Sequence, residues 1–238
     1  MEQPIHNCHG EALDYSYTAG ADHDGPLLVI GHGVTANKDR AWAVKLAEGL
    51  AAAGFASLRF SFSGNGKSDG DFRESTVTKE VEDLGAVLNA VGERPIYFAG
   101  HSMGGAVGVL RAVSDPRIAR LISLAGMVHT ADFARRKFGE LVPGKDLMWD
   151  KPECPLSQIF IDDMNEVRSV APLAPRVKVP WLLIHGTADS VVPFQESMEI
   201  RQAAGTNAEL VKLDGADHLF TDKEQDVARI VVAWLQRG

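Results

Sequence analysis

Residues 95–105 read PIYFAGHSMGG, and they say more about the fold than any other segment of the chain. Its apolar start predicts a buried strand, and residues 105–113 predict a helix. Between them, Gly100, Ser102 and Gly104 form a Gly-x-Ser-x-Gly pattern. In a strand–turn–helix context this pattern predicts a nucleophile elbow, a sharp turn that holds a serine hydroxyl above the end of a sheet. Small flanking residues permit such a strained turn.

A Gly-x-Ser-x-Gly pattern also occurs in ordinary turns, so the interpretation depends on partners elsewhere in the chain. Asp189 lies in residues 185–193, HGTADSVVP, and His218 lies in residues 215–220, GADHLF. Both come just after predicted strands, at the same sheet edge as Ser102. The sequence therefore predicts Ser102 as nucleophile, His218 as the base that takes its proton, and Asp189 as the group that orients the imidazole.

Other residues could compete for these roles. His101 and His185 adjoin strands, and we interpret both as structural. Asp217 is the direct neighbour of the proposed base, a position from which side chains rarely make the required bond. Asp162 and Asp163 belong to a predicted helix of the insertion described below. Asp189 remains the favoured acid.

A glycine-containing loop follows the first long buried strand. Residues 31–35 read GHGVT, and a loop at this place supplies one oxyanion donor in a nucleophile-elbow enzyme. We predict that the backbone N–H groups of Val34 and Met103 form the oxyanion hole. A simple glycine turn is the alternative.

Short apolar runs alternate with amphipathic ones along the chain. Strands are predicted at residues 27–30, 56–60, 96–99, 121–124, 181–185 and 209–213. Several are continuously apolar, as expected for a parallel sheet covered on both faces. Residues 5–17 predict an antiparallel edge hairpin. The alternation predicts a doubly wound, mostly parallel α/β fold with its ligand site at the carboxyl ends of the strands.

Helical spacing of apolar residues predicts helices at 39–53, 77–91 and 222–236. Thr221 and Glu224 are three positions apart, which predicts a capping box at the start of the last helix.

One segment, about 127–176, lacks a convincing strand of the sheet. It contains predicted helices at 130–138 and 157–169, several prolines and many apolar side chains. We interpret it as a cap or lid insertion above the strand ends, within a single domain that spans 1–238. Most of its apolar residues should pack; His129, Phe133 and Trp149 of the insertion, with Val191 outside it, are predicted to line a substrate pocket.

Charge and composition exclude some functions. The chain has 238 residues and a net charge of −8, which disfavours binding to nucleic acid or to an anionic membrane surface. It lacks an apolar run of transmembrane length and a secretory signal, so we expect no integral membrane association and a cytoplasmic location.

The cysteines and histidines do not predict a metal site. Cys8 and Cys154 are far apart and do not imply a disulfide framework. His6, Cys8, His9 and His23 have irregular spacing, so we expect neither a metal nor a cofactor.

Several of these motifs together resemble the α/β-hydrolases of the small serine-esterase type. They are His32-Gly33, residues 59–68, residues 100–105, residues 185–193 and the chain order Ser, Asp, His. Within that superfamily the chain is most similar to bacterial feruloyl (cinnamoyl) esterases and to the serine aminopeptidase-like or monoacylglycerol-lipase-like group. The resemblance covers almost the whole chain and implies a serine nucleophile, no metal and an insertion that acts as a cap.

The 59–68 loop departs from the family pattern. It carries Ser61 and Asn65 where the family usually has Asp and Arg or His, which weakens an assignment to one subfamily.

The sequence therefore predicts a carboxylic ester hydrolase that forms an acyl-Ser102 intermediate. Its partner would be a small to medium ester, with aromatic and hydroxycinnamoyl esters included. A serine peptidase or amidase, a thioesterase and an acyltransferase could use the same residues. A ligand-binding protein that keeps the fold without catalysis is a further alternative, and the oligomeric state is left open.

Overall fold

The centre of the molecule is a mixed sheet of seven strands, seen in a computed structural model that describes residues 3–22 and 24–237. The strands are β3 Tyr15–Thr18, β4 Leu27–Gly31, β5 Ala56–Phe60, β6 Ile96–His101, β7 Ile118–Leu124, β8 Trp181–Gly186 and β9 Ala208–Leu213. Their order is β3-β5-β4-β6-β7-β8-β9, and every neighbouring pair except β3–β5 is parallel. The predicted mostly parallel α/β sheet is confirmed.

The N-terminal segment differs in part from the predicted edge hairpin. Strands β1 Ile5–His6 and β2 Ala12–Leu13 pair with each other in a separate antiparallel sheet. Only β3 joins the main sheet, as its antiparallel edge beside β5. The segment is therefore antiparallel as predicted, but it is divided between two sheets.

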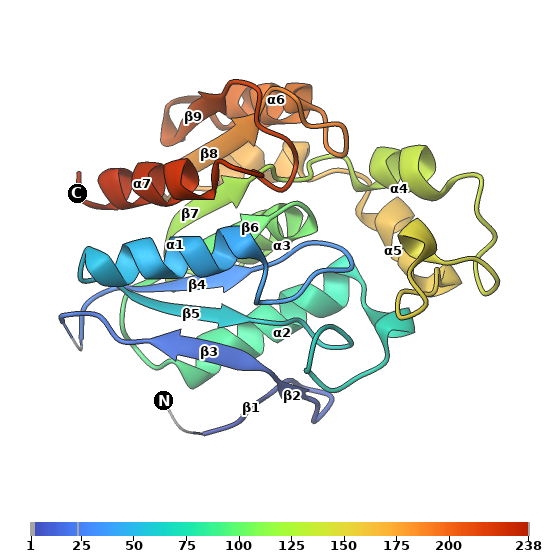
Figure 1. Cartoon of the computed structure of the whole chain (residues 1–238), viewed down its shortest axis with the longest axis horizontal. Coiled ribbons are helices and arrows are strands. Elements are labelled where there is room, and N and C mark those ends of the chain that lie inside the picture. The colour runs from blue at the N-terminus through green and yellow to red at the C-terminus, as the bar shows by residue number, and fades with distance from the viewer. Residues whose placement is uncertain (1–2, 23, 238) are drawn as a thin grey trace.

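Helices cover both faces of the sheet (Figure 1). The α-helices are α1 Ala41–Ala52, α2 Val77–Ala90, α3 Met103–Ala112, α4 Thr130–Phe138, α5 Gln158–Val167, α6 Phe194–Ala204 and α7 Glu224–Leu235. Short 3-10 helices are η1 Phe72–Glu74, η2 Met148–Asp150, η3 Ala171–Arg176 and η4 Gly205–Asn207. The predicted helices agree with the observed ones to within two residues at each end.

Strand β4 shows how the two faces are filled. Leu27 and Val29 belong to the core that includes α2 and α3, whereas Leu28 and Ile30 belong to the core that includes α1 and α7. Successive side chains of a strand point to opposite faces, so both faces of β4 are buried. A continuously apolar strand is the expected result.

The predicted capping box at α7 is wrong. The N-cap position is Lys223, which makes no side-chain cap bond. The Thr221 hydroxyl instead donates to Asp217 Oδ2 at 2.8 Å, and the Thr221 amide donates to Asp217 Oδ1 at 2.8 Å. The carboxylate of Asp217 thus holds Thr221 in the turn that precedes the helix, and the helix begins after Lys223 instead.

The insertion between β7 and β8 carries α4 and α5 and lies beyond the carboxyl ends of the strands (Figure 1). Its described residues lie outside the strands of the sheet. The buried Glu196 of α6 holds its first residues. Its Oε2 accepts from the Val128 and His129 amides at 2.7 and 3.1 Å, and its Oε1 accepts from Arg136 at 3.1 Å.

A second buried carboxyl group lies near the insertion, and one of its oxygens has no hydrogen-bond partner among the described residues. The residue is Glu80 of α2, which is 1% exposed, and the oxygen in question is its Oε2. Burial raises the pKa of Glu80 well above its usual range, and the carboxyls of Asp83 and Asp163 add to the effect. Ionisation of Glu80 therefore opposes folding.

We expect Glu80→Gln to raise the free energy of unfolding at pH 8 by about 1–3 kcal/mol, because the amide removes a buried charge. The folded protein holds the Glu80 proton more tightly than the unfolded chain, whose glutamate pKa is about 4.3. The penalty is therefore absent at low pH and grows as the pH rises above that value. Urea unfolding of the parent and the variant at pH 4 and pH 8 measures this penalty. Glu166→Gln, at an exposed position, is the control. The prediction is wrong if the free energy of unfolding at pH 8 rises in neither variant.

None of the helices within residues 3–22 and 24–237 is both long and apolar enough to cross a membrane.

Candidate active site

Four loops meet at the carboxyl edge of the sheet. Gly31 at the end of β4 lies beside Gly100 of β6, and Gly186 at the end of β8 lies beside Leu213 of β9. The loops that follow these parallel strands must therefore start at the same edge. They carry the residues that the sequence predicts as functional: Val34, Ser102, Asp189 and His218.

Ser102 occupies the sharp turn between β6 and α3. Its backbone has φ 54° and ψ −119°, a conformation that costs a residue other than glycine about 1–3 kcal/mol. Three hydrogen bonds hold it there. The Ser102 amide donates to the Leu124 carbonyl at 3.0 Å, and the Ser102 carbonyl accepts from the Gly105 and Met127 amides at 2.9 and 2.8 Å. The surrounding backbone thus fixes the strained turn.

Two glycines allow the chain to approach this serine closely. A Cβ on Gly100 would overlap the carbonyl of Gly104 one turn later. A Cβ on Gly33 would lie 2.6 Å from Cβ of Ser102, a distance that real side chains do not adopt. The loop after β4 can therefore pack against Ser102 only because residue 33 is glycine.

The buried His32 imidazole holds this loop in place. Its Nδ1–H donates to the Gly33 carbonyl at 2.9 Å, and its Nε2 accepts from the Phe62 amide at 3.0 Å. Burial lowers the pKa of His32 to about 4, so the ring is neutral at physiological pH and these two bonds set its tautomer.

Met103 directly follows Ser102 in the chain, and Val34 belongs to the loop after β4 that packs against Ser102. Neither backbone N–H makes a hydrogen bond to another described residue. Val34 lines the cavity described below, and Met103 is the first residue of α3. Both donors therefore retain their capacity to bind an oxygen atom.

His218 and Asp189 form a direct pair. The distance between His218 Nδ1 and Asp189 Oδ2 is 2.7 Å, and the Asp189 side chain is fully buried. Since a carboxylate only accepts, Nδ1 carries the proton and Nε2 of His218 is the unprotonated nitrogen of the neutral ring. Neither Nε2 of His218 nor Oγ of Ser102 has a hydrogen-bond partner among the described residues, and both residues line one cavity.

Asp189 accepts further hydrogen bonds. Its Oδ1 accepts from the Val191 and Val192 amides at 2.8 and 2.9 Å, and its Oδ2 also accepts from Nε2 of His185 at 3.1 Å. Burial acts to raise the pKa of Asp189, but the bonds from His185 and His218 outweigh it and hold that pKa well below its usual range. The carboxylate is therefore charged at neutral pH.

His185 and His101 hold the Asp189–His218 pair in place. The sequence analysis interpreted both only as structural residues. Ser197 fixes the ring of His185, whose Nδ1 lies 2.7 Å from the serine Oγ. His101 Nε2–H donates to the carbonyl of His218 at 2.8 Å, so it positions the backbone of that residue. Burial lowers the pKa of His101 to about 3, with the nearby His218 adding to the effect. His101 is therefore a neutral donor.

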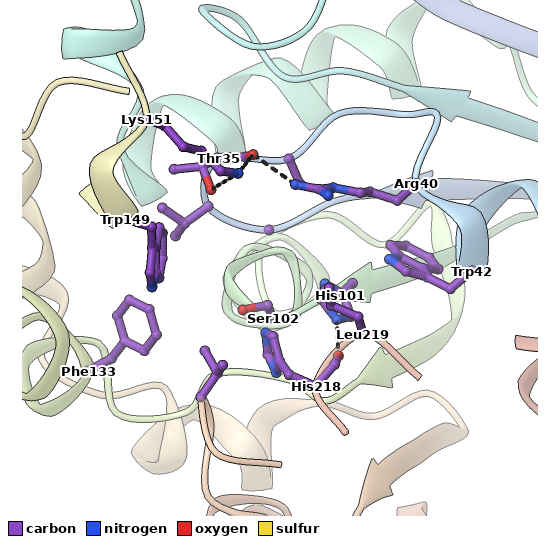
Figure 2. A pocket seen from close by; sticks show the side chains of 14 residues that line it. Thr35, Arg40, Trp42, His101, Ser102, Phe133, Trp149, Lys151, His218 and Leu219 are labelled. Atoms are coloured by element: carbon purple, nitrogen blue, oxygen red, sulfur yellow. Dashed lines mark hydrogen bonds between the residues drawn. The ribbon is translucent and has the colours of Figure 1, made fainter. Parts of the chain in front are cut away.

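The cavity beside Ser102 has a volume of about 210 Å³ (Figure 2). Of the predicted pocket residues, Phe133, Trp149 and Val191 line it. His129 does not; its Nε2 lies 2.8 Å from Glu199 Oε2 on α6. Lining residues that the sequence analysis missed are Thr35, Ala36, Arg40, Trp42, Lys151 and Leu219. They lie in loops and at helix starts, where periodicity carries no information about a cavity.

One group of described residues has the chemistry to hold a metal ion. Cys8, His9 and Glu82 place their ligand atoms within 4.8 Å of one another on the surface, outside the cavity. His6 is not part of this group, and His23 lies outside the described residues. His9 Nε2 and Glu82 Oε2 already form a hydrogen bond of 3.0 Å, which is ordinary for exposed side chains.

Known proteins are similar to this chain in sequence. The bovine mitochondrial palmitoyl-protein thioesterase ABHD10 is 26% identical over 211 residues, which cover 83% of this chain and 68% of that protein. The human ABHD10 is 27% identical over 184 residues, which cover 71% of this chain and 59% of its own length, less than two thirds.

Solved structures agree with this. The ferulic-acid complex of Est1E from Butyrivibrio proteoclasticus has a TM-score of 0.87 and 27% identity, and the match covers 99% of this chain and 98% of that one. A monoacylglycerol lipase of Paleococcus ferrophilus has a TM-score of 0.73 and 22% identity over 94% and 98% of the two chains, which shows a shared fold. A sequence profile described as the alpha/beta hydrolase family matches residues 27–230. The chain belongs to the alpha/beta hydrolase family.

Proposed function

We propose that the protein is a serine hydrolase that cleaves carboxylic esters through an acyl-Ser102 intermediate. One observation supports this most: Ser102 on its strained turn shares a cavity with His218, whose Nδ1 is bonded to the buried Asp189. Similarity to esterases and thioesterases supports hydrolysis of an acyl bond.

In the proposed reaction His218 Nε2 takes the proton of Ser102 as Oγ attacks the ester carbonyl carbon. Asp189 holds the proton on Nδ1 and stabilises the imidazolium that forms. The imidazolium then protonates the leaving alkoxide, which departs as the alcohol. Water, activated by the same imidazole, hydrolyses the acyl-Ser102 ester and regenerates the free hydroxyl. Serine–histidine contacts commonly tighten only when substrate is bound, so the unpaired state of both side chains is compatible with this role.

The carbonyl oxygen becomes an oxyanion when the serine attacks. We propose that the Val34 and Met103 N–H groups bind it, since both lack a partner among the described residues. His32 contributes indirectly, because it holds the loop that carries Val34.

The cavity favours small to medium esters with an aromatic or apolar part. Its volume is about 210 Å³, and Phe133, Trp149, Val191 and Leu219 contribute apolar surface. Ferulic acid, an aromatic acid, is bound in the Est1E structure. We propose that the insertion with α4 and α5 acts as a cap over this cavity, because it supplies Phe133, Trp149 and Lys151 to the lining.

Thioester hydrolysis is the second candidate. ABHD10 relatives are named as palmitoyl-protein thioesterases, and the same serine chemistry cleaves a thioester. A palmitoyl chain is long for the volume of this cavity, so we place shorter acyl thioesters in this class.

A fluorophosphonate probe tests the proposal directly. We expect stoichiometric covalent labelling that peptide mass spectrometry assigns to Ser102, together with turnover of p-nitrophenyl esters of two to eight acyl carbons and of methyl ferulate. Matched acyl thioesters and anilides in the same assay separate esterase, thioesterase and amidase activity. Absence of labelling, with a folded protein by circular dichroism, would support a ligand-binding protein instead.

A further inference from the structure

Two cations line the proposed active-site cavity. Arg40 precedes α1, and Lys151 follows η2 in the insertion, so distant parts of the chain supply them. Arg40 Nη2 donates to the Thr35 carbonyl at 3.1 Å, and Lys151 Nζ approaches the same oxygen at 3.5 Å and Thr35 Oγ1 at 3.4 Å. Figure 2 shows the two side chains converging on Thr35, with Ser102 and His218 across the cavity.

Neither cation is neutralised. No carboxylate oxygen among residues 3–22 and 24–237 lies within 4.0 Å of the Arg40 or Lys151 nitrogens, and the described lining of the cavity contains no aspartate or glutamate. Two other part-buried arginines of the chain do have partners: Arg59 pairs with Asp39 at 2.9 Å and Arg136 with Glu196 at 3.1 Å. In a chain of net charge −8, two unpaired cations at one cavity require an explanation.

The contacts with Thr35 in the loop after β4 do not by themselves explain why both Arg40 and Lys151 lie at this cavity. The bond from Arg40 to the Thr35 carbonyl leaves Nε of Arg40 buried with no hydrogen-bond partner among the described residues. A buried polar group without a partner is costly, and two like charges on one carbonyl oxygen repel each other. The contacts of Lys151 are long for hydrogen bonds. The enclosed Nε atom of Arg40 is out of reach of a ligand in the cavity, as is the Nε of Arg59 elsewhere in the chain, which also has no partner among the described residues. An anion between the two side chains would instead accept from hydrogens on the Arg40 Nη atoms and on Lys151 Nζ, and it would cancel the repulsion.

We propose that Arg40 and Lys151 form an anion subsite that selects esters in which one arm ends in a carboxylate or phosphate group. The assignment of the ligand as an ester rests on the proposed function; the subsite itself rests on the two cations. The neutral part of the substrate lies against Phe133 and Trp149, and the charged end is held by the guanidinium and the ammonium groups. The subsite thus sets specificity and takes no part in bond cleavage.

Paired substrates that differ by one charge test the subsite. On the acyl side the pair is mono-p-nitrophenyl adipate and its methyl ester; on the alcohol side it is 4-acetoxybenzoate and methyl 4-acetoxybenzoate. We expect kcat/KM of the charged member to exceed that of the neutral one by about 10- to 100-fold in at least one pair. The ratio should shrink as salt is added, because ions screen a partly exposed charge interaction.

Variants assign the preference to the two residues. Arg40→Gln and Lys151→Gln should each reduce the charged-to-neutral ratio by about tenfold or more, whereas Lys151→Arg should retain most of it. The ratio is the readout because loss of the Arg40 bond to Thr35 can slow both members equally. Lys145→Gln is the matched control, since it removes an exposed charge of the same insertion outside the cavity. Its ratio should equal that of the parent.

The outcomes separate this proposal from the proposed function. If Ser102 reacts with the fluorophosphonate but the ratio is near one in both pairs, the hydrolase stands and the subsite is overturned. If Ser102 is unreactive, calorimetric titration of the protein with 4-acetoxybenzoate and with its methyl ester still tests the anion subsite. A Kd at least tenfold lower for the anion, lost in Lys151→Gln, supports the subsite; equal Kd values overturn it.

Discussion

Replacement of Ser102 by alanine is expected to lower kcat/KM for p-nitrophenyl butyrate by about 10³- to 10⁶-fold. The hydroxyl of Ser102 is the proposed nucleophile. Thr35 is the other described lining residue with a hydroxyl, and its φ of 55° is also positive, but its Oγ1 lies beside the Lys151 ammonium at 3.4 Å. Alanine removes a single atom and keeps the turn, because three backbone hydrogen bonds hold residue 102 in place. Initial rates with purified protein measure the effect.

Ser114→Ala is the control for this substitution. Ser114 is exposed just beyond the end of α3, where its hydroxyl contacts only backbone carbonyls of that helix. It should retain parent activity. If Ser102→Ala stays within about tenfold of the parent while both variants are folded, the nucleophile is another residue, and the acyl-Ser102 intermediate has to be abandoned.

Replacement of Asp189 by asparagine should slow turnover by about 10³- to 10⁴-fold. The asparagine oxygen can keep the bonds from the Val191 and Val192 amides, which leaves its NH2 group facing the rings of His185 and His218. An NH2 group donates, so His218 must present an unprotonated Nδ1 to it and carry its proton on Nε2. In that tautomer the imidazole cannot accept the proton of Ser102. Steady-state kinetics with the butyrate ester gives the loss.

Asp217→Asn tests the competing acid next to His218 in sequence. The Asp217 carboxylate accepts from the Leu219 and Thr221 amides and from the Thr221 hydroxyl, so it organises the turn before α7. We expect a change in activity below about tenfold, since removal of a surface turn bond mainly affects local stability. A larger loss in Asp217→Asn than in Asp189→Asn would assign the orienting role to Asp217.

Most elements of the fold could be predicted because local pattern and tertiary context agree. The apolar run at 27–30 is buried on both faces of the sheet, as its composition predicts. The capping box at Thr221 is wrong because the helix begins two residues later, after Lys223, and because Asp217 already accepts from the Thr221 amide that Glu224 would have capped. The edge hairpin was predicted as one unit, yet Leu13 and Tyr15 belong to different sheets.

The candidate site also has parts that the sequence could predict and parts that it could not. The strand-to-loop positions of Ser102, Asp189 and His218 place them at one edge of the sheet, which chain order and sheet topology can predict. The second imidazole on Asp189 could not be predicted in this way. His185 ends a buried strand like many structural residues, and only its rotation towards the carboxylate brings it into contact.

The parallel sheet, the serine turn and the order in which the polar side chains follow the strands can all be derived from the amino-acid sequence. These properties come from spacing along the chain, because side-chain alternation and the demand for glycine at close approaches act over a few residues. Which side chains share the cavity, and which charges stay unpaired there, depends on contacts between distant parts of the folded chain. Arg40 and Lys151 are more than one hundred positions apart, and their meeting at Thr35 depends on how the insertion packs over the strand ends.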